Sequence, residues 1–114
     1  LTLETIPPEV AAVARDCLID TLGVALAGSR RPVVERLSAV ARQNYAAGPA
    51  HLWGKQGGLS APGAALVNGA AAHALDFDDN CYDGFVHGSA VIVPAAIAAA
   101  EAAEAAGADL LVAF

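Results

Sequence analysis

Small apolar residues recur every three or four positions along most of the chain, and this spacing restricts the fold more than any other feature. From Pro8 to Ala27 the repeat is continuous, and Gly28 is a natural terminator. The apolar residues are mostly alanine, valine and leucine, because 56% of the chain is hydrophobic but only 5% is aromatic. Alanine favours helix and lets helices approach closely. The sequence therefore predicts a tightly packed all-α domain.

Proline and glycine residues divide the rest of the chain into further helices. A short apolar run at 51–54 is typical of an extended segment, and the acidic stretch at 76–87 is expected to form a loop. The predicted helices cover residues 8–27, 32–46, 60–77 and 89–107, and a fifth begins at 109.

Hydroxyl side chains precede three of these helices at positions suited to capping. Thr5, Ser60 and Ser89 each offer an oxygen to the free N–H groups of a first turn. Pro94 has two possible places: in the first turn of a late-starting fourth helix, or inside that helix, where it would kink it.

The fifth predicted helix has room for fewer than two turns, so we expect residues 1–114 to form part of a larger helical domain. A small chain this apolar also covers its hydrophobic surface poorly. We therefore expect it to pack against a partner chain or against further sequence.

The charge balance excludes nucleic acid as a partner. Twelve acidic residues against six basic ones give a net charge of −6, which is unsuited to nucleic acid.

The longest apolar run, at 90–100, is shorter than the ~20 residues that span a bilayer. Cys17 and Cys81 form no disulfide framework, and no basic-then-apolar leader is visible. We expect a cytoplasmic protein without nucleic-acid or membrane partners.

Carboxylates gather where a sequence optimised only for folding would avoid them. Asp76, Asp78 and Asp79 follow the third helix at its negative C-terminal end. Such rule-breaking is expected at functional sites. Asp78 and Asp79 are equally consistent with the start of a solvated loop.

Two histidines flank this acidic stretch. His73 shares a helix face with Gly69 and Asp76, where a satisfied core histidine is the simpler interpretation. His87 precedes the apolar fourth helix, next to Ser89 and its free N–H groups, which attract anions. An imidazole there could move protons beside a bound carboxylate.

Three other interpretations of the sequence are open. The spacing of Asp78, Asp79 and Asp83 is similar to the aspartate-rich motif by which helical prenyl synthases hold Mg²⁺ and a diphosphate. A transition-metal site from His73, Asp76 and His87 is less favoured, because the sequence contains no close histidine pair. The third interpretation is a non-catalytic helical module that dimerises through its alanine-rich faces.

The MmgE/PrpD family has a signature that resembles the run N-G-A-A-A-H-A-L-D-F-D-D at 68–79, followed by a His-x-Ser step into an apolar helix. The segment at 20–28 is similar to the family's first long helix, and Trp53-Gly54 is similar to the step before its third. Two departures from the family pattern are Gly88, where the family commonly has proline, and the stretch at 80–87, which is about one residue longer than expected.

The resemblance implies the N-terminal portion of a helical domain that is joined to a smaller α/β domain in a homodimer. It implies a lyase for small di- and tricarboxylates that needs neither metal nor organic cofactor. We expect 2-methylcitrate dehydration first, and cis-aconitate decarboxylation or epimerisation of an imino diacid as alternatives within the family.

The resemblance also assigns residues. It places Asp76 and His87 in the active site as catalytic residues, with Asn80 nearby. We add Ser89 and His73 as substrate-binding candidates, and we expect further basic residues of the site to come from sequence outside this chain.

Overall fold

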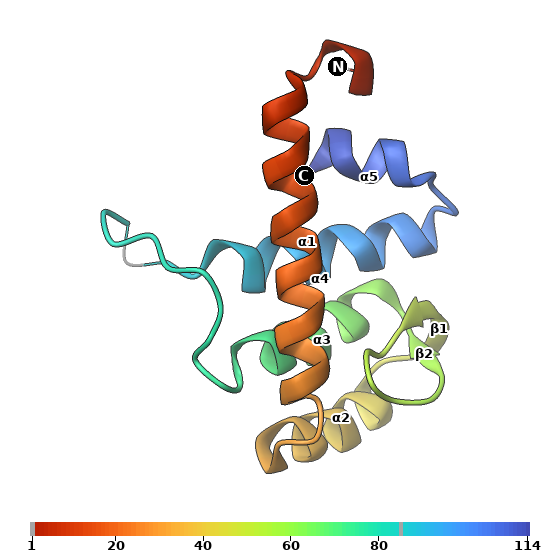
Figure 1. Cartoon of the computed structure of the whole chain (residues 1–114). Coiled ribbons are helices and arrows are strands. Elements are labelled where there is room, and N and C mark those ends of the chain that lie inside the picture. Colours follow the sequence, from red (N-terminus) through yellow and green to blue (C-terminus); the bar gives the residue numbers. More distant parts are fainter. Residues whose placement is uncertain (1, 85) are drawn as a thin grey trace.

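The computed structural model describes residues 2–84 and 86–114 and confirms a predominantly helical fold (Figure 1). Within those residues, five α-helices follow a short 3₁₀ turn, and two antiparallel strands lie between the second and third helices. The elements in chain order are η1 (Leu3–Thr5), α1 (Pro8–Gly28), α2 (Pro32–Asn44), β1 (Ala47–His51), β2 (Gly58–Leu59), α3 (Ala61–His73), α4 (Gly88–Ala102) and α5 (Gly107–Ala113).

Proline sets the start of the first three helices. Pro8, Pro32 and Pro62 each occupy the first or second position of α1, α2 and α3. Proline lacks an N–H and has a helical φ, so it fits a first turn whose N–H groups have no partner inside the helix. The predicted starts near residues 8, 32 and 60 are confirmed.

The predicted hydroxyl caps are wrong. Thr5 belongs to η1, and Pro7 takes the cap position of α1. Ser60 does take the cap position of α3, but its side chain makes no capping hydrogen bond to the described residues. The fourth helix starts one residue early, so His87 is its cap residue and Ser89 lies in its first turn. In α1 and α3 the proline already removes one free N–H, which weakens the need for a cap.

Two helix ends also differ from the prediction. The third helix ends at His73 rather than 77, and Asp76 just beyond it has a left-handed φ of 52°. The fourth ends at Ala102, where Glu104 has the same φ of 52°, and Gly107 begins α5 instead of ending α4. A residue with left-handed backbone cannot continue a right-handed helix. Because Asp76 and Glu104 are not glycines, nothing in the sequence indicated that the backbone would be left-handed there.

The extended segment lies earlier than predicted. Tyr45 adopts extended backbone, so α2 stops short of residue 46 and β1 follows directly. The predicted strand at 51–54 is therefore mostly turn, because β1 ends at 51. Gly54 and Gly57 in this turn have positive φ values of 72° and 76°, which glycine adopts without strain.

The helix α3 lies at the centre of the molecule and packs against α1, α2 and α4. Figure 1 shows α1 lying across α3 and α4. Small side chains make these contacts close, and α1 meets α3 at Gly28. The buried apolar residues of α3 are Ala64, Val67, Ala71 and Ala72.

Main-chain atoms meet where α3 crosses α4. Pro94 lies inside α4 and has no N–H to donate to the carbonyl of Ala90, four residues earlier. That carbonyl oxygen lies 3.1 Å from the position that a side chain on Gly69 would occupy. Gly69 therefore allows the two backbones to approach, and the contact fixes the spacing of the helices that flank the site.

Asn68 ties the small sheet to α3. Its side chain is buried, accepts a hydrogen bond from the Trp53 N–H at 3.0 Å and donates one to the His51 carbonyl at 2.9 Å. Both bonds satisfy backbone groups of a segment that leaves the sheet, so Asn68 fixes that segment on the helix.

Large apolar side chains remain exposed on α1 and α4, as expected from the composition. Ile19 on α1 is 70% exposed and Val91 on α4 is 72% exposed. Val10, Val13, Leu26 and Ile92 are also exposed. Within the described residues, no helix combines the length and the apolar character needed to cross a bilayer.

Candidate functional site

The aspartate-rich stretch forms the loop that joins α3 to α4. Because α3 and α4 pack together, this loop brings the last residue of α3 beside the residue that precedes α4. The two residues are His73 and His87, whose ring centroids are 4.7 Å apart with the ring planes inclined at 58°. The chain therefore has a close histidine pair, which the sequence spacing had not indicated.

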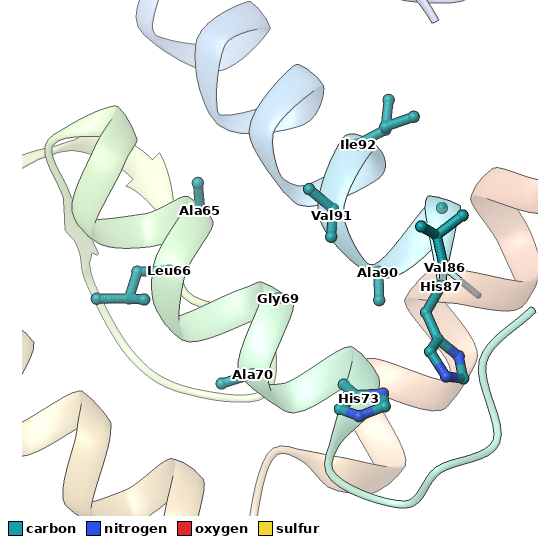
Figure 2. Close-up of a pocket in the computed structure, with 11 residues that line it drawn as sticks. Ala65, Leu66, Gly69, Ala70, His73, Val86, His87, Ala90, Val91 and Ile92 are labelled. Atoms are coloured by element: carbon teal, nitrogen blue, oxygen red, sulfur yellow. The ribbon is translucent and has the colours of Figure 1, made fainter. Parts of the chain in front are cut away.

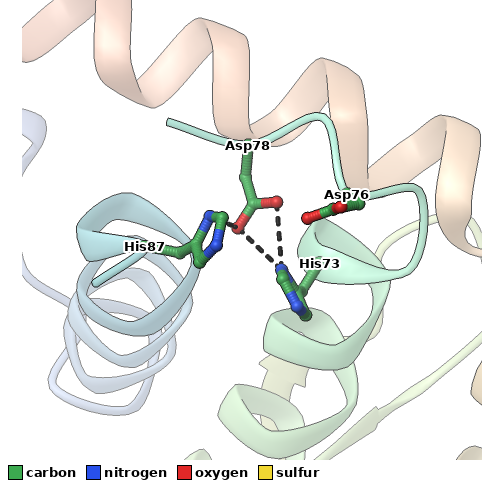
Figure 3. Close-up of side chains that lie close together, drawn as sticks. All are labelled: His73, Asp76, Asp78 and His87. Atoms are coloured by element: carbon green, nitrogen blue, oxygen red, sulfur yellow. Dashed lines mark hydrogen bonds and ion pairs between the residues drawn. The ribbon is translucent and has the colours of Figure 1, made fainter. Parts of the chain in front are cut away.

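Asp78 lies between the two imidazoles (Figure 3). Its side chain is fully buried, and both of its carboxylate oxygens lie 3.1 Å from Nδ1 of His73. Nδ1 of His87 lies 3.3 Å from Oδ2 of the same carboxylate. Of the two interpretations that the sequence left open, the burial excludes a solvated loop position for Asp78. Its one hint in the sequence is that it follows His73 by five residues, just after the helix ends.

His87 has an incompletely satisfied ring. Nδ1 is buried and has no hydrogen-bond partner with good geometry among the described residues, although Oδ2 of Asp78 is near. A buried imidazole nitrogen without a good partner carries a desolvation cost of about 1–3 kcal/mol. A small rotation toward Asp78 would remove that cost.

Asp76 completes a group of four side chains. His73, Asp76, Asp78 and His87 each offer an atom, and these atoms lie within 4.8 Å of one another. Figure 3 shows Asp76 on the side of Asp78 that faces His73. The left-handed backbone of Asp76 turns the chain sharply enough to place two aspartates beside one helix end.

Nitrogen and oxygen donors in this number suit a transition-metal ion in principle. Nδ1 of His73, however, makes a hydrogen bond to the Asp78 carboxylate at 3.1 Å, and Nδ1 of His87 lies 3.3 Å from the same carboxylate without hydrogen-bond geometry. The residues are arranged as one carboxylate between two imidazoles.

Asp79 stabilises the start of α4. Its Oδ1 accepts a hydrogen bond from the backbone N–H of Ser89 at 3.0 Å. A carboxylate is favourable at this positive helix end. One of the N–H groups that we expected to be open to a substrate anion is therefore already bound by the chain itself. The Ser89 side chain is buried in the first turn.

The acidic residues are not arranged around one point as in the aspartate-rich motif of a prenyl synthase. Asp78 faces two imidazoles and Asp79 faces the N-terminus of α4. Asp83 lies exposed in the turn that follows. Three carboxylates with different directions and partners disfavour the Mg²⁺–diphosphate interpretation.

Asn80 lies exposed in the same loop, beyond Asp79. The structure records no hydrogen bond from its side chain to the described residues. Of the five residues predicted for the site, His73, Asp76 and His87 come together, Ser89 lies in the adjoining helix turn, and Asn80 stays outside the group.

An apolar groove of about 800 Å³ extends from the two histidines between α3 and α4 (Figure 2). Figure 2 shows His73 and His87 together at one end of it. The rest of its lining consists of Ala65, Leu66, Gly69, Ala70, Val86, Gly88, Ala90, Val91 and Ile92.

Comparison with known proteins gives the family. The model of the MmgE/PrpD N-terminal domain matches residues 1–114. The chain belongs to the MmgE/PrpD family. A cis-aconitate decarboxylase from Mus musculus is 31% identical over 102 residues, and the match covers 85% of this chain. The chain spans 21% of the length of that MmgE/PrpD relative. No solved structure matches the chain significantly.

Proposed function

We propose that this chain contributes the N-terminal part of the helical domain of a lyase that acts on small di- and tricarboxylates. Family membership supports a lyase, because a similar MmgE/PrpD protein is a decarboxylase by name. The observation that carries the proposal for this chain is that Asp76 and His87 belong to one group of side chains whose atoms lie within 4.8 Å of one another, and that His87 lines the groove.

The reaction requires a proton to move at a carbon next to a carboxylate. In a dehydration, a base takes the proton from that carbon, and the hydroxyl on the neighbouring carbon leaves as water with a proton from an acid. In a decarboxylation, the C–C bond to the departing CO₂ breaks and a proton joins the carbon. Imidazole exchanges protons near neutral pH, so it suits either direction.

His87 moves the proton and Asp76 orients it or binds the substrate. His87 is half-buried at the end of the groove, so its ring reaches a ligand while shielded from bulk water. His73 lines the same end of the groove and serves as a substrate-binding residue. Ser89 and Asn80 are further candidates for contacts to the substrate.

Two substrates are candidates. Dehydration of 2-methylcitrate is the first, on the strength of the sequence resemblance. Decarboxylation of cis-aconitate is the second, because the mouse relative carries that activity in its name. The exposed apolar side chains of α1 and α4 support a homodimer or packing against further sequence.

The test is an assay of the full-length protein with 2-methylcitrate and with cis-aconitate. We expect turnover of one of them, and a loss of at least about 100-fold in kcat for His87→Gln, in line with the effect of removing a general acid or base. His51→Gln is the matched control, since His51 is an exposed histidine of β1 paired with Glu101. An active His87→Gln variant would refute the assignment of proton transfer to His87.

A further inference from the structure

Asp78 has no role in the function proposed above, yet it is the most buried charged side chain of the site. Its carboxylate is fully buried, while the two imidazoles beside it are partly open to solvent. A buried carboxylate is costly unless paired and hydrogen-bonded. The charged or chargeable partners that the structure records for Asp78 are His73 and His87.

The geometry restricts where the imidazole protons lie. An ionised carboxylate only accepts hydrogen bonds, and its two oxygens have room for several donors. Nδ1 of His73 makes a hydrogen bond to that carboxylate at 3.1 Å, and the buried Nδ1 of His87 lies 3.3 Å from its Oδ2, outside hydrogen-bond geometry. An Nδ1 without a proton would set its lone pair against that of an oxygen in a buried place. Both rings are therefore favoured with the proton on Nδ1.

We propose that Asp78 is a positioning residue that fixes both imidazoles in the Nδ1–H tautomer and leaves Nε2 of His87 as the free proton acceptor. The catalytic part of this inference rests on the proposed lyase function, whereas the tautomer part does not. The structure records no hydrogen bond from Nε2 of His87 to the described residues, so this nitrogen has no competing partner. Figure 3 shows the second ring nitrogen of His73 on the side away from Asp78.

The proton transfer then balances within the site. The C–H bond of the substrate breaks, its proton forms an N–H bond at Nε2 of His87, and the electron pair stays on carbon. His87 becomes an imidazolium, and Asp78 remains a carboxylate that compensates the new positive charge. His73, bonded to both oxygens of Asp78, keeps the carboxylate from turning away.

The substitution Asp78→Asn tests this role. Asparagine keeps the shape but removes the negative charge and replaces one acceptor oxygen by an NH₂ donor. The Nδ1–H tautomers then lose the charge that favours them, and we expect at least one ring to move its proton to Nε2. An equivalent aspartate-to-asparagine change in serine proteases lowers kcat about 10⁴-fold through the wrong tautomer. We expect Asp78→Asn to lower kcat about 10²- to 10⁴-fold and to leave KM within about twofold.

Asp83→Asn is the matched control, since Asp83 lies exposed in the same loop. It should leave kcat and KM unchanged. A merely structural role for Asp78 predicts a change in the unfolding temperature with kcat per folded molecule preserved. That result would overturn the proposal.

The second measurement needs no activity. In protein labelled with ¹⁵N-histidine, nitrogen chemical shifts separate a protonated ring nitrogen from a bare one, and His73→Gln and His87→Gln assign the signals. We expect Nδ1–H for both rings in the wild-type protein and a switch of at least one in Asp78→Asn. A wild-type His87 with its proton on Nε2 would overturn the proposal even in an active lyase. Absence of turnover with both rings as Nδ1–H would instead overturn the proposed function and uphold the tautomer assignment.

Discussion

Gly28, the last residue of α1, lies against the carbonyl oxygen of Ala71 in α3, and a methyl group on Gly28 would overlap that oxygen. The obstacle is backbone, which cannot swing aside as a side chain can. We therefore expect Gly28→Ala to lower the free energy of unfolding by about 1–3 kcal/mol, as for other overpacking changes. Urea denaturation followed by circular dichroism measures the change.

Gly23 in the same helix is the matched control. Nothing lies within 4 Å of a methyl group built there, so Gly23→Ala keeps only the intrinsic helix preference of alanine. It should raise the free energy of unfolding by about 0.5–1 kcal/mol. Equal effects at both positions would contradict the close crossing of α1 and α3.

Asn68 provides the second stability prediction. Asn68→Ala removes the partners of two backbone groups, the Trp53 N–H and the His51 carbonyl. Each unpaired buried group costs about 1–3 kcal/mol, so we expect a loss of about 2 kcal/mol or more. The control is Asn44→Ala at the exposed end of α2, where the change should stay within about 0.5 kcal/mol.

Asp79 should matter for the start of α4. Asp79→Ala removes the acceptor of the Ser89 N–H and a favourable charge at the helix N-terminus, which together contribute about 1 kcal/mol. Amide hydrogen exchange at Ser89 should become faster. The same substitution at the exposed Asp83 should leave that exchange rate unchanged, and a similar acceleration there would count against a capping role.

Metal removal should not abolish the lyase activity proposed for the full-length protein. The Asp78 carboxylate lies within 3.1 Å of Nδ1 of His73 and 3.3 Å of Nδ1 of His87, so it can balance the charge of these rings without an ion. We expect dialysis of the full-length protein against EDTA to preserve kcat. Loss of activity that Zn²⁺ or Mn²⁺ restores would reveal a metal centre in these four residues and refute the carboxylate-centred arrangement.

The 114-residue chain on its own should turn over neither substrate at a detectable rate. The described lining of the groove contains no lysine or arginine to bind the carboxylates of a tricarboxylate, while Asp76 and Asp78 lie beside the two histidines that line its end. Comparison of the chain with the full-length protein in the same assay tests this. Turnover by the chain alone would mean that the histidines and helix N-terminus suffice for substrate binding.

Much of the fold can be predicted from local sequence features. Pro8, Pro32 and Pro62 mark three helix starts because proline fits few other places in a helix. Helix ends at Asp76 and Glu104 were missed because residues other than glycine take left-handed backbone there. Tertiary contacts decide where such left-handed residues occur, and intrinsic helix propensities do not predict them.

The sequence singled out three of the four clustered residues, His73, Asp76 and His87, but not Asp78 between the imidazoles. His87 and Asp76 stand out by motif and by charge at an unfavourable helix end. Asp78 was indistinguishable from a loop aspartate, because its burial depends on the packing of α3 against α4. The histidine pair was hidden for the same reason, since His73 and His87 are far apart in sequence and meet only through the loop.

The contact between Gly69 and the Ala90 carbonyl limits how the groove could be redesigned. At that point both walls are main chain, and no choice of side chain in the Pro94-containing turn can move them apart. Substitutions at this helix crossing would therefore not widen the range of substrates. The adjustable positions are the larger side chains of the lining, Leu66, Val91 and Ile92, where shortening enlarges the opening and leaves the helix crossing intact.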